Sequence, residues 1–153
     1  MNPSAINPPR TYAEWVTILD MLASRTNDEA VLEAMLQGTI EWQSGVAERF
    51  ARKLVDTINS RMNAATDRFQ KEMSRSGGQE SAIVRALMAL RKEMGFLAKA
   101  ISLPAIPAED RNQYRKLVLE QADKIQKSLE DSARNDRTGK LASIVRNNRV
   151  NAL

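Results

Sequence analysis

The chain has 153 residues, and its 23 lysine and arginine residues exceed its 19 aspartate and glutamate residues by four. This length fits one domain with a hydrophobic core. The chain has no cysteine and no histidine, which excludes a disulfide framework, thiolate and histidine zinc sites, and catalytic pairs built on histidine.

Two short helices are predicted in the N-terminal part of the chain. Residues 1–10 hold three of the five prolines and are expected to form an extended leader. Thr11 then opens a capping box, and apolar residues at helical spacing predict a helix over residues 11–23. A second helix is predicted after Asn27, a candidate N-cap, and Gly38 is expected to end it as its C′ residue.

A long third helix is predicted over residues 39–75, with Thr39 as its cap. Its apolar positions form two faces, because a spacing of four residues drifts around a helix. The N-terminal face, expected to receive the two short helices, consists of Trp42, Val46 and Phe50, and the longer seam consists of Ala47, Ala51, Leu54, Ile58, Met62, Ala65 and Phe69. Gly45 lies inside this helix, where it indicates either a close backbone approach or a break.

A turn at residues 76–79 precedes a heptad pattern that predicts the fourth helix. The positions of this seam are Ile83, Leu87, Leu90, Met94, Leu97 and Ile101. A fifth helix is expected to begin near Pro107 and to run to about Ala133. Its apolar stripe consists of Tyr114, Val118, Ala122, Ile125 and Leu129. One or two further helical turns are expected over residues 141–145.

Together these elements predict an all-α fold, with no convincing strand pattern. The expected architecture is an elongated antiparallel three-helix bundle with the two short N-terminal helices docked at one end. The expected division of the chain is an extended leader (1–10), a single helical domain (11–135) and a basic, partly apolar C-terminal segment (136–153).

The net positive charge is concentrated at the C-terminal end. Residues 1–133 hold 18 basic and 18 acidic side chains, whereas residues 134–153 hold five basic side chains and one acidic. The five are Arg134, Arg137, Lys140, Arg146 and Arg149. Because apolar residues are mixed with them, the segment is expected to fold on a partner or to dock back on the bundle. Arginines that repeat every seven residues, at Arg61, Arg68 and Arg75, are expected on a solvated face of mixed charge.

These features favour a non-enzymatic helical interaction protein, such as an adaptor, regulator or assembly factor. Its basic C-terminal segment would contact a protein partner. Trp42 is a further candidate contact, because tryptophan is enriched at interface hot spots, although a core position is the more common role. No catalytic residue, metal ligand or cofactor-binding residue is assigned.

Two alternative functions remain open at this stage. A nucleic-acid-binding protein would place the same basic segment on phosphates. A carboxylate-dependent enzyme would need an inward cluster of acidic side chains, although the acidic pairs in the sequence fit first helical turns and i,i+4 pairing.

Location and self-association follow from the apolar pattern. No apolar run approaches the ~18 residues that span a bilayer, and the first residues lack the features of a signal peptide. We therefore expect a cytoplasmic protein without membrane insertion. A homo-oligomer is expected only if the seam of residues 83–101 finds no partner within its own chain.

Overall fold

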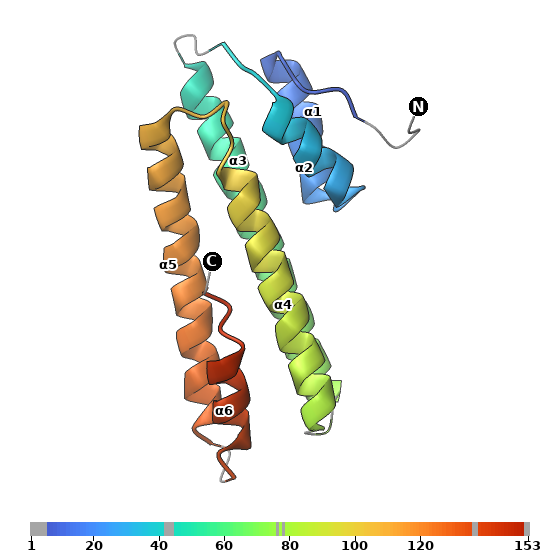
Figure 1. Cartoon of the computed structure of the whole chain (residues 1–153), viewed down its shortest axis with the longest axis vertical. Coiled ribbons are helices and arrows are strands. Elements are labelled where there is room, and N and C mark those ends of the chain that lie inside the picture. The colour runs from blue at the N-terminus through green and yellow to red at the C-terminus, as the bar shows by residue number, and fades with distance from the viewer. Residues whose placement is uncertain (1–5, 42–44, 76, 78, 136–137, 152–153) are drawn as a thin grey trace. The chain divides into compact units, whose positions relative to one another are not determined.

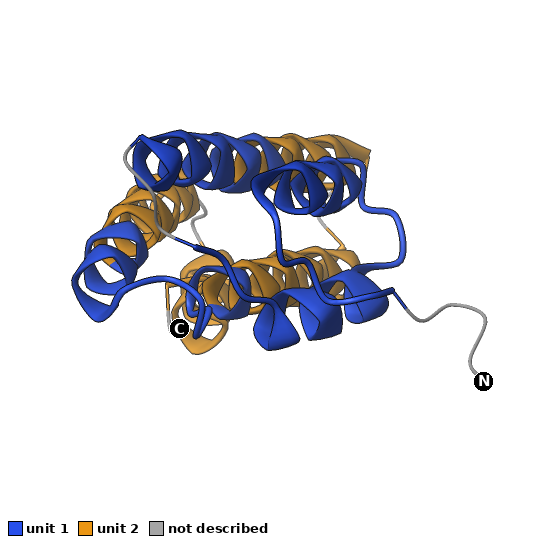
Figure 2. Cartoon of the chain, turned by 90° about the horizontal axis from the view of Figure 1, so that it is seen from above, with its two compact units in different colours: residues 1–61, 99–115 blue, residues 62–98, 116–153 orange. Residues whose placement is uncertain are grey.

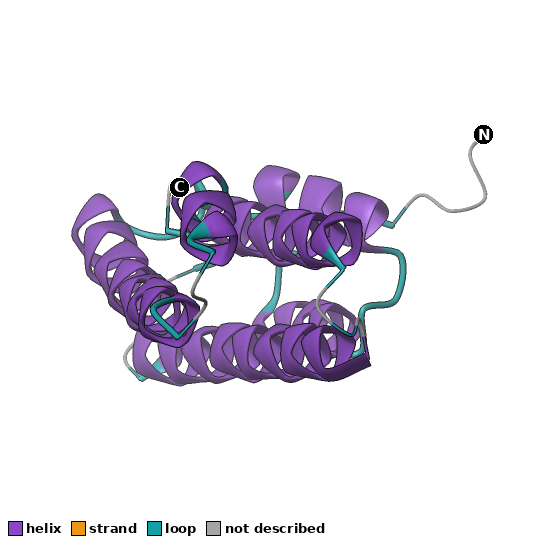
Figure 3. Ribbon diagram, turned by 90° about the horizontal axis from the view of Figure 1, so that it is seen from below, coloured by secondary structure: helices purple, strands orange, loops and turns teal. Residues whose placement is uncertain are grey.

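The computed structural model describes residues 6–41, 45–75, 77, 79–135 and 138–151. These residues form six helices and no strand (Figure 1, Figure 3). The helices are α1 (Tyr12–Ala23), α2 (Asp28–Gln37), α3 (Val46–Arg75), α4 (Glu80–Ile101), α5 (Ala108–Ala133) and α6 (Lys140–Asn147). The all-α class predicted from the sequence is confirmed over the described residues.

The chain forms two compact units, each built from separate stretches of sequence (Figure 2). Unit 1 comprises Met1–Arg61 and Lys99–Arg115, and unit 2 comprises Met62–Ala98 and Lys116–Leu153. The three long helices therefore each contribute one part to each unit. Unit 1 holds nine basic and ten acidic residues, whereas unit 2 holds 14 basic and nine acidic residues, a formal charge of +5. The excess positive charge thus belongs to unit 2.

The core of unit 1 is built around Trp15, which is fully buried. The Thr11 hydroxyl accepts a hydrogen bond from the Glu14 backbone N–H at 3.2 Å, which confirms the predicted N-cap of α1. The Trp15 ring packs edge-to-face on Phe50, with 5.1 Å between ring centroids. Its indole Nε1 donates to the Thr39 carbonyl at 2.9 Å. These contacts join α1 to the first part of α3 and to the connector before it.

Both predicted caps of α2 lie where they were expected, but neither has the usual cap geometry. Asn27 occupies the N-cap position, but its backbone is left-handed and its side chain makes no capping hydrogen bond. Gly38 ends the helix as predicted, but with φ −71° and ψ 156° its backbone is extended and not left-handed. A Cβ atom on Gly38 would lie 2.6 Å from Trp15 Cζ2 and 2.9 Å from Pro9 Cγ. Glycine is needed there because the buried indole and the proline ring come too close for any side chain.

We expect Gly38→Ala to lower the free energy of unfolding by about 1–3 kcal/mol, because the added methyl group overpacks the site beside Trp15. Gly95→Ala is the matched control, since a Cβ atom at Gly95, inside α4, would meet nothing within 4 Å. This control should gain up to about 1 kcal/mol from better helix propensity. Urea unfolding followed by circular dichroism measures both variants, and equal losses would contradict this explanation.

The start of α3 also differs from the prediction. The helix begins at Val46 and not at Thr39, whose backbone N–H donates to the Pro9 carbonyl at 2.9 Å. Gly45 has φ +83°, so of the two readings of this glycine the break in the helix is correct. Of the predicted N-terminal face, Trp42 lies outside the described residues. Phe50, from the same face, is buried and lies on α3, which also carries the longer seam.

The predicted seam of α4 is confirmed at all six of its positions, which are 6% exposed or less. These side chains are therefore buried within the single chain, and the condition for self-association through this seam is not met. In α3 the seam from Leu54 to Phe69 is buried as predicted, whereas Ala47 and Ala51 are only half-buried. No helix among the described residues has the length and apolar character needed to cross a membrane.

Helix α5 begins one residue after Pro107, whose carbonyl accepts the first helical hydrogen bond, from Arg111 N–H at 2.9 Å. The preceding connector is anchored by Leu103 and Ile106, both buried. At the start of α5, partial burial and then the carboxylate of Asp110 raise the pKa of the Tyr114 hydroxyl.

Candidate functional site

The C-terminal segment folds within unit 2. Gly139, at φ +72°, precedes α6 and turns the chain into it. The side chains of Ile144, Val145 and Val150 are buried, at 9%, 2% and 0% exposure. Of the two arrangements left open by the sequence, docking back on the helices is the one observed.

A buried amide on α5 fixes the end of this segment. Gln126 is 2% exposed, and its Oε1 accepts a hydrogen bond from the Val150 backbone N–H at 3.0 Å. The Gln126 Nε2 in turn donates to Glu130 Oε1 at 3.1 Å. Nearby, Asn151 Nδ2 donates to Asp123 Oδ1 at 2.7 Å. This anchor was not predicted, because a glutamine beside the apolar stripe has the pattern of a solvated residue.

The basic residues of the segment, and Arg134 just before it, face solvent wherever the structure describes them. Exposed side chains are found at Arg134, Lys140, Arg146 and Arg149. The Arg134 guanidinium lies 3.6 Å from the Asp131 carboxylate, and both side chains are more than half exposed, so this pair holds the arginine only weakly. The Arg149 Nε donates to the Asn151 Oδ1 at 3.2 Å. Two predicted contacts, Arg137 and Trp42, lie outside the described residues.

Beside this segment, unit 2 contains an apolar pocket of about 390 Å³ between α3, α5 and α6. Its apolar lining consists of Phe69, Met73, Ile125, Leu129, Leu141 and Val145. A polar hollow of about 480 Å³ lies along α5, with Lys124 and Lys127 among its lining residues. Neither feature was predicted, because each combines residues from different elements or from the polar side of one helix.

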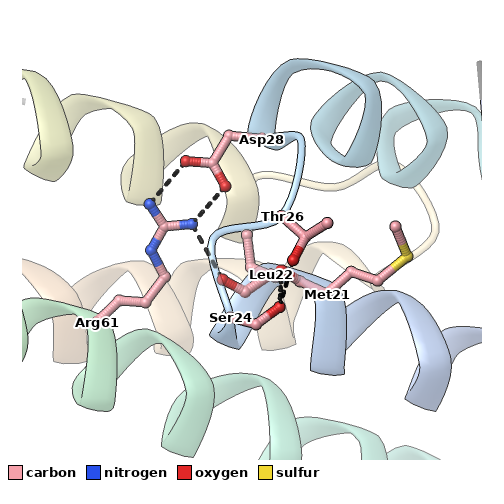
Figure 4. A network of polar contacts seen from close by, with 6 residues as sticks. All are labelled: Met21, Leu22, Ser24, Thr26, Asp28 and Arg61. Atoms are coloured by element: carbon pink, nitrogen blue, oxygen red, sulfur yellow. Dashed lines mark hydrogen bonds and ion pairs between the residues drawn. The ribbon is translucent and has the colours of Figure 1, made fainter. Parts of the chain in front are cut away.

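In unit 1 the most buried charged group is Arg61, at 2% exposure. Its guanidinium makes two hydrogen bonds of 2.9 Å to the Asp28 carboxylate, and its Nη1 also donates to the Leu22 carbonyl at 3.1 Å (Figure 4). The prediction that Arg61 lies on a solvated face is therefore wrong. Arg61 instead joins α3 to the end of α1 and the start of α2, and this role is structural.

Unit 1 also contains a polar pocket of about 420 Å³, whose lining mixes the cations Arg49, Arg52 and Lys53 with the carboxylates Asp20 and Asp56. Asp20 is already engaged, since its carboxylate lies 2.8 Å from the Lys53 ammonium. Among the residues that the structure describes, no group of three or more acidic side chains is placed to hold a metal ion.

No protein-family model, curated protein or solved structure matches this chain. The function is therefore inferred from the geometry of the two units.

Proposed function

We propose that this chain is a non-enzymatic interaction protein that binds an acidic surface of a protein partner through its basic C-terminal segment. The observation that supports the proposal is the way this segment folds. Its apolar side chains Ile144, Val145 and Val150 are buried in unit 2, while its described basic side chains remain exposed. Because the segment is already folded, binding need not carry the entropic cost of ordering a free tail.

Two features favour a protein partner over nucleic acid. Residues 134–153 contain no aromatic side chain, whereas proteins that bind single strands usually stack bases on aromatic rings. The exposed basic residues also lie in the unit that holds the apolar pocket, and protein interfaces combine apolar centres with polar rims. The competing explanation is that the same basic residues bind the phosphates of a nucleic acid, and the experiment below distinguishes the two.

A truncation would not test this proposal cleanly. Removing the C-terminal segment would also remove Ile144, Val145 and Val150 from the core of unit 2. Burial of each such side chain contributes about 1.5–3 kcal/mol, so loss of binding would be confused with loss of the fold. Substitution of exposed basic residues avoids this problem.

We therefore expect the variant Arg134→Ala/Lys140→Ala/Arg146→Ala/Arg149→Ala to keep its fold and to lose the partner. The matched control is Arg68→Ala/Lys71→Ala/Arg85→Ala/Lys92→Ala, which removes the same number of positive charges from exposed positions elsewhere in unit 2. This control should still bind the partner. Both are compared with the wild type by affinity capture from nuclease-treated native extract at increasing salt, because contacts between exposed charges are screened by salt.

The captured protein is then purified, and its affinity for each form is measured directly. The expected result is a loss of about tenfold or more in affinity for the first variant only. Equal binding by both variants would contradict the proposal. Capture that disappears after nuclease treatment would assign the segment to nucleic acid instead.

A further inference from the structure

We propose that the apolar pocket and the adjoining polar hollow of unit 2 together bind one medium-chain anionic amphiphile, such as a fatty carboxylate. The alkyl chain would lie between α3, α5 and α6, and the carboxylate would lie at Lys124 and Lys127. This inference does not depend on the proposed protein partner, because the exposed basic residues Arg134, Lys140, Arg146 and Arg149 do not line either feature.

The pocket has the size and lining of a site for an alkyl chain. Its volume of about 390 Å³ lies within the roughly 300–1,000 Å³ that is usual for small-ligand sites. Helices from three parts of the chain surround it, and six of its lining residues are apolar. Met73, Leu129 and Leu141 remain only partly buried there, so a bound alkyl chain would remove further apolar surface from water.

The polar hollow supplies the place for a negatively charged head group. Lys124, Ser128 and Ser132 line both the pocket and the hollow, so the two features adjoin one another. These residues follow one another at intervals of four along α5 and so share one face of the helix. Their ammonium and hydroxyl groups can donate hydrogen bonds to a carboxylate.

The charges around the hollow favour an anion over a cation. Lys127 adds a second ammonium group, and Asp131 is the one carboxylate among the described lining residues. A cationic head group would therefore meet two lysines, whereas a carboxylate would be attracted by both.

Isothermal titration of the full-length protein with octanoate, decanoate and decyltrimethylammonium tests the inference. We expect one decanoate per chain, bound about fifteenfold more tightly than octanoate, because decanoate has two more methylene groups and each one that is buried contributes roughly a fourfold gain in affinity. Decyltrimethylammonium, whose alkyl chain is one carbon longer, should still bind about tenfold more weakly than decanoate because its charge is reversed.

Three variants locate the site. Met73→Trp should fill the pocket and abolish decanoate binding, whereas Lys124→Ala should remove most of the preference for the anionic head group and keep the dependence on chain length. Lys116→Ala is the matched control, since Lys116 is exposed on α5 and lines neither feature. The surface variants keep the test informative even if Met73→Trp fails to fold, which circular dichroism would reveal.

Absence of decanoate binding, equal affinity for the two head groups, or many decanoates per chain would overturn the inference. So would an equal loss of affinity in Lys116→Ala and Lys124→Ala. If Met73→Trp releases a captured protein while decanoate does not bind to the wild type, the pocket holds a segment of that protein and the inference fails. The proposed function would survive each of these outcomes, because its test uses different residues.

Discussion

Asp28→Ala should lower the free energy of unfolding by about 3–5 kcal/mol, because it leaves a buried guanidinium without its carboxylate partner. Arg61 is 2% exposed and holds Asp28 through two hydrogen bonds of 2.9 Å. The Leu22 carbonyl accepts a third bond from the same group but carries no full charge. Urea unfolding, followed by circular dichroism, measures the loss.

The control for this prediction is the exposed ion pair of the same unit. Lys53 and Asp20 lie 2.8 Å apart, with side chains 32% and 65% exposed, so Asp20→Ala should cost less than about 1 kcal/mol. The double variant Arg61→Met/Asp28→Ala should be more stable than Asp28→Ala alone, because it removes the unpaired cation as well. Similar losses of stability for Asp20→Ala and Asp28→Ala would show that the cost of Asp28→Ala does not come from leaving the Arg61 guanidinium without its carboxylate partner.

Trp15→Ala should lower the free energy of unfolding by about 3–5 kcal/mol, because it empties the centre of the unit 1 core. The fully buried indole packs on Phe50 and also donates a hydrogen bond to the Thr39 carbonyl. Trp15→Phe keeps an aromatic ring but removes that donor, so it should cost about 1–3 kcal/mol. Thermal unfolding followed by circular dichroism ranks the two variants.

The same indole explains the need for glycine at position 38, so the effects of substitutions at positions 15 and 38 should be coupled. In the Trp15→Phe background, Gly38→Ala should cost less than in the wild type, because the atom that the new methyl group approaches most closely is gone. Costs that simply add would indicate that the two positions are not coupled through this contact.

Helix periodicity was sufficient to predict the helical class and the buried seam of α4. From Ile83 to Ile101 the six seam residues alternate at intervals of four and three, and every one of the six is buried. The start of α3 could not be predicted in this way. Thr39 has the residue type of a helix cap, but hydrogen bonds with Pro9 and Trp15 hold it outside the helix. Tertiary contacts here override a local preference.

The polar anchors of both units were beyond the reach of sequence patterns for a related reason. Arg61 pairs with Asp28, 33 residues away, and Gln126 binds the backbone of Val150, 24 residues away. In a single sequence each of these residues has the polarity of a solvated position, and only its distant partner makes burial favourable. The exposed basic residues of the C-terminal segment were easier to identify, because the excess of positive charge is local.

Both proposals require residues 140–151 to be folded within unit 2, and the Val150 amide tests this most directly. Its N–H is buried and donates to the Gln126 side chain, outside the hydrogen-bond ladder of α6. Amide hydrogen exchange followed by NMR should therefore be slow at Val150 in the wild type and markedly faster in Gln126→Ala. Exchange in the wild-type protein at the rate of an unfolded chain would contradict the folded segment and both proposals built on it.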